Sequence, residues 1–308
     1  MRLRLLIFYC FESRLTRYDK AMKNHRYLSY TKLQSTVLAS CVFLLMTGCA
    51  THSRLENAEK TASTNLMQNI KISSKPFVIT LFNKITNSNE PATVYIEGDG
   101  LAWLGRRTPS LDPTPIHPIA LELAAKDPSP NVIYMARPCQ YSKLTTTQAC
   151  PTKYWTSHRF APEVINAMSN ALSNIKQQNN LSEFNLVGFS GGGAVAALIT
   201  AQRNDILSLR TVAGNLDHIL TSKIHNVSDM QGSLNPTEVA SQISNIPQHH
   251  FIGTEDKIIP FAIYKSFRKA SGNTDCIRYT LVQNTSHNKG WNEKWRHLLS
   301  EPIKCQKQ

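Results

Sequence analysis

Short apolar runs alternate with helical patterns from about residue 76 to the end of the chain. The runs are apolar or β-branched almost throughout, which is typical of strands covered on both faces of a sheet. They predict seven strands, at Phe77–Phe82, Thr93–Glu97, Val132–Ala136, Phe184–Phe189, Leu207–Val212, His250–Gly253 and Ile277–Val282. Strands that alternate with helices indicate an α/β fold with a mainly parallel central sheet flanked by helices.

Two helices between these strands have clear patterns. Apolar residues between Val164 and Ile175 recur on one helical face, and Pro162 falls in the first turn. The segment after Ser190 reads GGGAVAALITAQ, which is small and apolar on all sides and predicts a buried helix. Because the chain has no internal repeat, we predict a single domain over residues 76–308.

A different pattern precedes this domain. Residues 36–50 read TVLASCVFLLMTGCA, an apolar run too short to span a bilayer, with Lys23, Arg26 and Lys32 ahead of it. This is the layout of a secretory signal peptide, which we predict over residues 1–48. The charged region is long if translation begins at Met1, so we predict that Met22 is the true start. Residues 49–75 are mostly polar and are predicted to form a tether.

The end of the apolar run, Met46-Thr47-Gly48-Cys49, resembles the bacterial lipobox. The resemblance implies cleavage before Cys49 and a lipid on its thiol, so that the membrane becomes a partner of the chain. Ala50 rather than Asp follows the cysteine, which favours the outer membrane, facing the periplasm, over the inner membrane. The N-terminus therefore predicts a lipid-anchored protein of the bacterial cell envelope.

Beyond Cys49, the mature chain keeps four cysteines, an even number in an oxidising compartment: Cys139, Cys150, Cys276 and Cys305. Four cysteines allow three connectivities. Because only a short loop separates Cys139 from Cys150, we favour a disulfide between these two, which leaves Cys276 to pair with Cys305. Zinc is the alternative, but no CxxC pair supports it.

Composition and charge narrow the class of protein. With 41% hydrophobic and 18% charged residues, the chain is neither disordered nor collagen-like. The formal net charge is +13, but eight Lys and Arg against two Asp and Glu in residues 1–48 account for six of these charges. No block of Lys and Arg stands out in the remainder, so we expect no nucleic-acid partner.

Gly188-Phe189-Ser190-Gly191-Gly192 fits the pattern G-x-S-x-G, between a predicted strand and a predicted helix. A nucleophilic serine in this setting sits on a tight turn, where glycines let strand and helix approach closely. The serine needs a histidine to take its proton and a carboxylate to hold the histidine. Asp256 and His287, each in a loop after a predicted strand, are the candidates. The rivals are Glu255 and Asp217 for the acid and His218 for the base.

The order Ser190, Asp256, His287 resembles that of the α/β-hydrolase family, from about residue 76 to the end of the chain. The resemblance implies an eight-stranded type of fold, an acyl-enzyme mechanism, and no metal or organic cofactor. We find no long apolar insertion before the final strands that would form a lid.

The resemblance also implies two backbone N–H donors for the oxyanion of the tetrahedral intermediate. One is Gly191, and the other is Asp99 or Gly100 in the loop after the Thr93–Glu97 strand. Glu97-Gly98 replaces the His-Gly common in the family, and an acidic residue beside a forming oxyanion requires an explanation. Trp103, Arg106 and Arg107 follow in the same loop. We interpret this loop as solvated, with a surface for an anionic or amphiphilic acyl substrate as the alternative.

Two hypotheses of function follow. The first is a serine hydrolase of the esterase type that cleaves an acyl ester, thioester or amide bond of a small-molecule or acyl substrate at the cell envelope. The second is a noncatalytic envelope lipoprotein that uses the same fold as a binding module.

Overall fold

The computed structural model describes residues 54–142 and 150–305. The predicted signal peptide over 1–48, the start at Met22 and the lipidation of Cys49 lie outside the described residues. Among the described residues, no helix is both long and apolar enough to cross a membrane.

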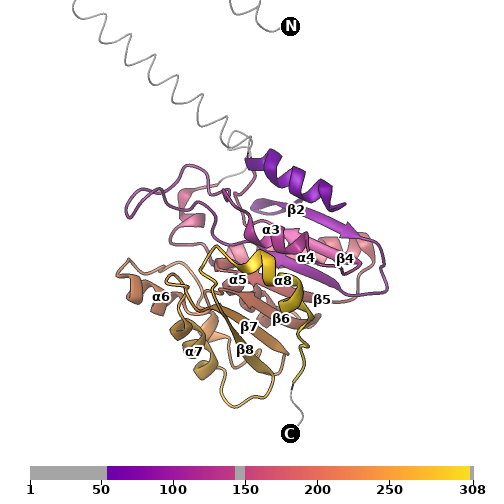
Figure 1. The fold of residues 1–308 in the computed structure, drawn as a ribbon. Coiled ribbons are helices and arrows are strands. Elements are labelled where there is room, and N and C mark those ends of the chain that lie inside the picture. Colours follow the sequence, from indigo (N-terminus) through magenta and orange to yellow (C-terminus); the bar gives the residue numbers. More distant parts are fainter. Residues whose placement is uncertain (1–53, 143–149, 306–308) are drawn as a thin grey trace, which may run out of the picture. The chain divides into compact units, whose positions relative to one another are not determined.

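An eight-stranded sheet with the strand order β1-β2-β4-β3-β5-β6-β7-β8 forms the centre of the fold (Figure 1). The strands β3 to β8 run parallel to one another, whereas β1 pairs antiparallel with β2, and β2 pairs antiparallel with β4. The strands are β1 Gln68–Ser74, β2 Phe77–Ile85, β3 Ala92–Ile96, β4 Asn131–Met135, β5 Phe184–Phe189, β6 Ile206–Val212, β7 Gln248–Gly253 and β8 Ile277–Val282.

Helices cover both faces of this sheet (Figure 1). The first hydrophobic cluster joins one face to α4, α5 and α7, and the second joins the other face to α3, α8 and a helix over residues 54–64. The α-helices are α3 Ile119–Ala124, α4 Pro162–Asn179, α5 Gly191–Gln202, α6 His218–His225, α7 Phe261–Ala270 and α8 Trp291–Ser300, and the 3-10 helices are η1 Thr152–Trp155 and η2 Pro236–Glu238. The predicted fold class is therefore confirmed.

All seven predicted strands are present, and β5 and β8 have the predicted bounds. The helix that begins at Pro162 and the buried helix after Ser190 are also present, as α4 and α5. The strand β1 was not predicted. Its residues alternate between solvent and core, with Ile72 and Ser74 buried, and such a short polar-rich run carries a weak signal.

The prediction of a tether over residues 49–75 is wrong for the part that the structure describes. Residues 54–64 form a helix whose Ala58 and Ala62 are fully buried in the second hydrophobic cluster. The strand β1 then adds to the edge of the sheet next to β2. Small residues spaced four apart place an apolar stripe on one side of a helix whose other side is polar. The domain thus begins well before residue 76.

Both favoured disulfides are present in the structure. Cys139 pairs with Cys150 across 11 residues, and Cys276 pairs with Cys305 across 29. The first closes a loop directly after β4, and the second ties the C-terminal segment to the start of β8.

Glu97, which follows β3, is buried in the core with 1% of its surface exposed. Its carboxylate accepts a hydrogen bond of 2.8 Å from the backbone N–H of Gly98, and the phenol of Tyr134 lies nearby. Burial raises the pKa of Glu97 to about 7, and its interactions with Gly98, Ala120 and Tyr134 offset only part of this effect. The carboxyl group therefore titrates near neutrality, beneath the loop that follows β3.

We expect the substitution Glu97→Gln to stabilise the protein more at pH 8 than at pH 5. Between the ordinary pKa of a glutamate and about 7, only the unfolded state ionises, so the wild type loses stability as the pH rises through this interval. A neutral glutamine has no such loss. The gap in melting temperature between variant and wild type should widen by something on the order of 5–10 °C from pH 5 to pH 8. An equal change in the melting temperatures of the two proteins from pH 5 to pH 8 would contradict this assignment.

Candidate active site

Ser190 lies on a tight turn between β5 and α5. Its backbone has φ 51° and ψ −119°, which is strained for a residue with a side chain. Backbone hydrogen bonds of 2.9 Å fix the turn, from Ser190 N to Val212 O and from Asn215 N to Ser190 O. A side chain on Gly188 would meet the backbone of Gly192. The turn therefore projects the hydroxyl of Ser190 beyond the carboxyl ends of the strands.

Three side chains that are distant in sequence meet at this turn. The Nε2 atom of His287 lies 2.9 Å from the Oγ atom of Ser190, and its Nδ1 atom lies 2.9 Å from the Oδ2 atom of Asp256. The side chain of Asp256 is fully buried, and that of His287 is 11% exposed. In this arrangement the imidazole can take the proton of the serine hydroxyl while the carboxylate holds it in the required tautomer.

Two neighbouring turns hold the acid and the base. Asp256 follows β7, and its Oδ1 atom accepts hydrogen bonds from the backbone N–H groups of Ile258 (2.8 Å) and Ile259 (2.9 Å). His287 lies in the loop between β8 and α8, where its carbonyl accepts a hydrogen bond of 2.9 Å from the indole of Trp291. Because the Oδ1 atom of Asp256 is occupied by its own turn, the Oδ2 atom is directed at the imidazole.

The rival acids occupy other positions. Asp217 caps the N-terminus of α6 through the backbone N–H of Leu220, and it also accepts hydrogen bonds from Asn235 (3.0 Å) and Ser266 (2.6 Å). The carboxylate of Asp217 is thus saturated by structural contacts. Glu255 is exposed on the turn beside Asp256.

The rival base, His218, is buried and packs against the ring of Phe160, with ring centroids 5.8 Å apart. Burial lowers its pKa. His249 and His250 lie within β7, where burial lowers the pKa of each to about 3. Of these histidines, none is bonded to Ser190.

The backbone around Ser190 offers donors for an oxyanion. Gly191 begins α5 directly after the serine, so its N–H lies at a helix N-terminus. In the loop after β3, the N–H of Gly98 is bonded to Glu97 and that of Leu101 to Pro113 O (3.1 Å). Within the described residues, the N–H groups of Asp99 and Gly100 have no hydrogen-bond partner. The structure therefore leaves free the two donors that the sequence analysis left open.

The acidic side chain of Asp99 is neutralised by two arginines. Arg159 Nη1 lies 2.5 Å from Asp99 Oδ2, and Arg137 Nη1 lies 3.4 Å from Asp99 Oδ1. Burial alone would raise the pKa of Asp99, but the two guanidinium charges outweigh it and lower this pKa. The carboxylate also lies where a side chain on Gly191 would be. The acid beside the nucleophile is thus part of a cluster with net charge +1.

Sequence reasoning missed Arg137 and Arg159. Arg137 follows β4 and Arg159 follows η1, so neither is close to Asp99 in the chain. The one available signal was Asp99 itself, because an acid beside a forming oxyanion requires a counter-charge.

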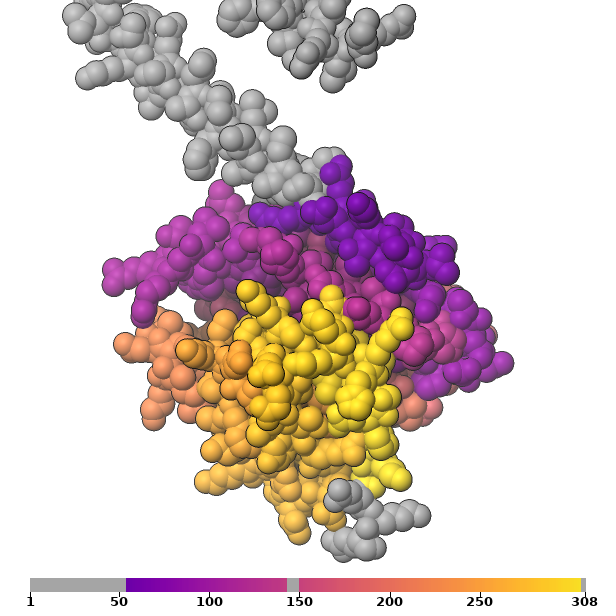
Figure 2. Space-filling view, in the orientation of Figure 1, coloured from indigo at the N-terminus to yellow at the C-terminus, as the bar shows by residue number. Residues whose placement is uncertain are grey.

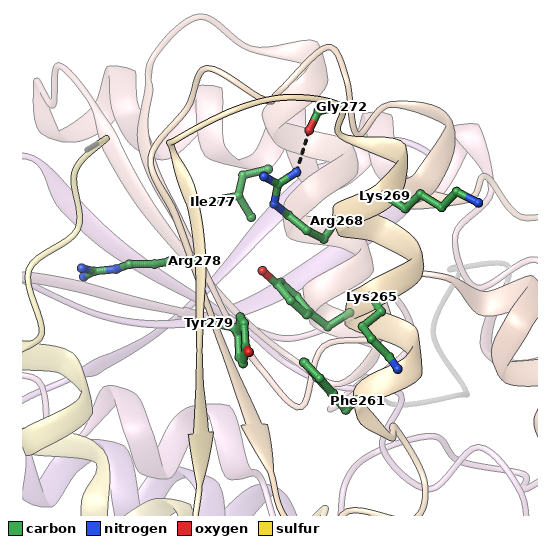
Figure 3. Close-up of a pocket in the computed structure, with 9 residues that line it drawn as sticks. Phe261, Lys265, Arg268, Lys269, Gly272, Ile277, Arg278 and Tyr279 are labelled. Atoms are coloured by element: carbon green, nitrogen blue, oxygen red, sulfur yellow. Dashed lines mark hydrogen bonds between the residues drawn. The ribbon is translucent and has the colours of Figure 1, made fainter. Parts of the chain in front are cut away.

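A larger groove, of about 690 Å³, lies between α7 and β8 and contains none of the residues described above. Figure 3 shows Phe261 and Tyr279 facing the groove, with the guanidinium of Arg268 bonded to the carbonyl of Gly272. The hollow beside Asp99, Arg137 and Trp155 measures only about 10 Å³. Ser190 remains the candidate nucleophile, because volume alone supplies no reactive group. No group of three His, Cys, Asp or Glu side chains in the described part of the chain is arranged to hold a metal ion.

Solved structures of a phospholipase and of esterases have a similar fold. A membrane phospholipase A, described as a bacterial virulence factor, is 11% identical with a TM-score of 0.56, over 88% of this chain and 97% of that one. Est1E from Butyrivibrio proteoclasticus is 11% identical with a TM-score of 0.54, over 76% and 96%. The esterase PF2001 from Pyrococcus furiosus is 11% identical with a TM-score of 0.56, over 76% and 89%. At these identities the likeness shows the fold, which is that of the α/β-hydrolases.

No curated protein sequence matches the chain significantly. A family model does match: the family described as Serine hydrolase (FSH1) covers residues 125–287. This match spans more than half of the 308 residues and runs from before Ser190 to His287. The chain therefore belongs to the FSH1 serine hydrolase family.

Proposed function

We propose that this hydrolase cleaves an acyl ester, thioester or amide bond through a triad of Ser190, His287 and Asp256. The observation that carries the proposal is the continuous path of two 2.9 Å hydrogen bonds from Asp256 through His287 to Ser190. The strained turn and the free N–H groups at the same place support it. Nothing in the structure favours the alternative of a noncatalytic binding module.

The reaction follows from this geometry. His287 Nε2 takes the proton of Ser190 as the oxygen attacks the acyl carbon, and the resulting imidazolium is stabilised by Asp256. The N–H of Gly191, with that of Asp99 or Gly100, stabilises the oxyanion. His287 then gives its proton to the leaving group, and the acyl group remains on Ser190. A water molecule, deprotonated by His287, attacks the acyl-enzyme; the bond between the acyl carbon and Ser190 Oγ then breaks, the acid leaves, and His287 returns the proton to Ser190.

The structural neighbours, a phospholipase A and two esterases, support an acyl substrate. The local charge supports it as well. Because Arg137 and Arg159 outweigh Asp99, the site does not repel the negative charge that develops on the acyl oxygen.

We expect a fluorophosphonate probe to label Ser190 in the wild-type protein. The probe reacts with a serine that a base has activated, so it requires no knowledge of the substrate. Mass spectrometry of a digest should locate the adduct on Ser190, and both Ser190→Ala and His287→Ala should abolish it. A folded wild-type protein that is not labelled would refute the proposed triad.

The carboxylates Asp256 and Asp217 can be compared directly. Asp256→Asn should lower kcat by roughly 10³- to 10⁴-fold, because an amide in this place favours the wrong tautomer of His287. Asp217→Asn keeps an N-cap residue on α6 and should change kcat little. Hydrolysis of a short-chain aryl ester measures both. The opposite order of effects would assign the acid to Asp217.

The proposal extends to the location of the enzyme at the bacterial envelope, with a lipid on Cys49 and the outer membrane favoured. Its support is the lipobox-like sequence Met46-Thr47-Gly48-Cys49 and the apolar run ahead of it. The two disulfides, Cys139–Cys150 and Cys276–Cys305, are consistent with an oxidising compartment.

Lipidation is tested by the mass of the mature protein from a bacterial host. The wild type should begin at Cys49 and carry a diacylglyceryl group, whereas Cys49→Ser should remain unprocessed. A wild-type product with an unmodified Cys49 would exclude the anchor, and a precursor that includes residues 1–21 would exclude the start at Met22.

A further inference from the structure

The connection from β3 to α3 is long and carries exposed apolar side chains. Connections of this length in compact domains are usually functional. A backbone hydrogen bond of 2.9 Å from Leu104 N to Thr108 O closes a hairpin, whose tip contains the exposed Arg106 and Arg107. Four large apolar residues in this connection are 40% to 74% exposed: Trp103, Leu104, Leu111 and Ile116.

A second group of exposed apolar residues lies on α6, just after it, and on the turn after β7. These are 43% to 51% exposed: Ile219, Ile224, Val227 and Ile258. The two segments are joined by a hydrogen bond of 2.7 Å between His225 Nε2 and the carbonyl of Ile258. The backbone N–H of Ile258 in turn donates to Asp256, so this group borders the triad. We call the eight residues of both groups the apolar rim.

Both groups of the apolar rim lie in connections that follow the carboxyl ends of parallel strands, which is the edge of the sheet where Ser190 also lies. The segment 155–160 connects the groups: Trp155 donates to Ser110 O (3.0 Å), and Phe160 packs against His218. In the view of Figure 2, the loop after β3 and the α6 region both lie on the left side of the molecule. Of twelve exposed large hydrophobic residues in the described ranges, eight belong to the apolar rim. Such clustering marks an interaction surface.

The charges around the apolar rim narrow the choice of partner. Arg106, Arg107, Lys223 and Lys257 are exposed cations in its segments, against the exposed acids Asp229 and Glu255. The rim is therefore apolar with a net positive charge. An isologous contact between two copies would bring these cations together, which disfavours a second copy as the partner. A bilayer surface with anionic headgroups matches both the apolar side chains and the charge.

The path of the chain points to the same surface. The described chain begins at Arg54, whose guanidinium donates to Thr114 O (2.8 Å) and pairs with Asp112 (3.5 Å). Both partners belong to the connection that carries the first group of rim residues. The apolar run of residues 36–48 and Cys49 come shortly before Arg54 in the sequence.

We propose that the apolar rim docks onto an anionic phospholipid surface, and that the substrates of the enzyme are acyl esters of lipids in that surface. This inference rests on the proposed function for the ester cleavage, but the docking itself requires no catalysis. Side chains of the rim enter the boundary between headgroups and acyl chains, and Arg106 and Arg107 contact the phosphates. The scissile ester then reaches Ser190 directly from the lipid phase.

The chain contains its own probe of docking. It has four tryptophans, of which Trp155, Trp291 and Trp295 are buried and Trp103 is 40% exposed in the apolar rim. The full chain with Ser190→Ala, which leaves lipids intact, is added to vesicles of phosphatidylcholine and phosphatidylglycerol with brominated acyl chains. Bromine quenches an indole at short range, so Trp103 emission should fall. The same chain with Trp103→Phe supplies the emission of the buried tryptophans.

Matched variants distinguish membrane contact by the apolar rim from membrane binding by the N-terminal anchor, because all of the variants keep the same N-terminus. In the Ser190→Ala chain, Leu104→Ser with Ile224→Ser should remove the quenching. In the active enzyme, the same two substitutions should lower turnover of vesicle lipid by about tenfold or more and leave hydrolysis of a dissolved short-chain ester unchanged. Leu207→Ser with Leu281→Ser, at positions outside the rim that are 38% and 41% exposed, should change neither the quenching nor the turnover of vesicle lipid. Vesicles of phosphatidylcholine alone should quench less.

Three outcomes would overturn the proposal: absent quenching in vesicle-bound chain, equal quenching in the rim variant, or a dimer in light scattering that the rim variant abolishes. Fluorophosphonate labelling without lipid reports the triad alone. Labelling without quenching would thus reject the docking and retain the proposed triad. Quenching without labelling would retain the docking and reject the triad.

Discussion

The site depends on the close approach of three backbone segments at Ser190. A side chain on Gly192 would collide with the carbonyl of Ile96 at the end of β3, and one on Gly188 would collide with Gly192 itself. Glycine at both positions lets α5 start immediately above the sheet, which forces Ser190 into its strained turn. The first N–H groups of α5 consequently point to the place where an oxyanion would form.

This close packing imposes an electrostatic problem that the rest of the site resolves. Asp99 packs against Gly191, so an anionic carboxylate lies beside the candidate nucleophile Ser190. Arg159 and Arg137 compensate for it from two other connections, and Arg137 is held close to the Cys139–Cys150 disulfide. For Glu97, burial instead raises the pKa to about 7, so that the uncharged form of its carboxyl group persists up to neutral pH. The negative charges of the two acids are thus limited in different ways, by ion pairs at Asp99 and by a raised pKa at Glu97.

How far the sequence predicts this molecule differs from part to part. The strands β5 and β8 are short runs that consist mostly of apolar, aromatic and β-branched residues with clear ends, and local pattern was enough to place them. The triad candidates were found because a short motif, a strand context and a fixed order restrict the choice. In contrast, β1 and the helix over 54–64 owe their place to tertiary packing of a few small residues. Arg137, Arg159 and the apolar rim depend on which loops meet in space, and spacing along one chain does not contain that information.

The contact of Arg54 with Thr114 also limits the distance between a lipid on Cys49 and the folded domain. Four residues lie between Cys49 and Arg54, and the five Cα–Cα steps from one to the other reach at most about 18 Å when fully extended. With a lipid on Cys49, the hydrolase would remain within a protein radius of its own leaflet and would not reach an opposite membrane. Its reaction would then be confined to molecules in, or delivered to, the leaflet that holds it, and each released fatty acid would enter that same leaflet.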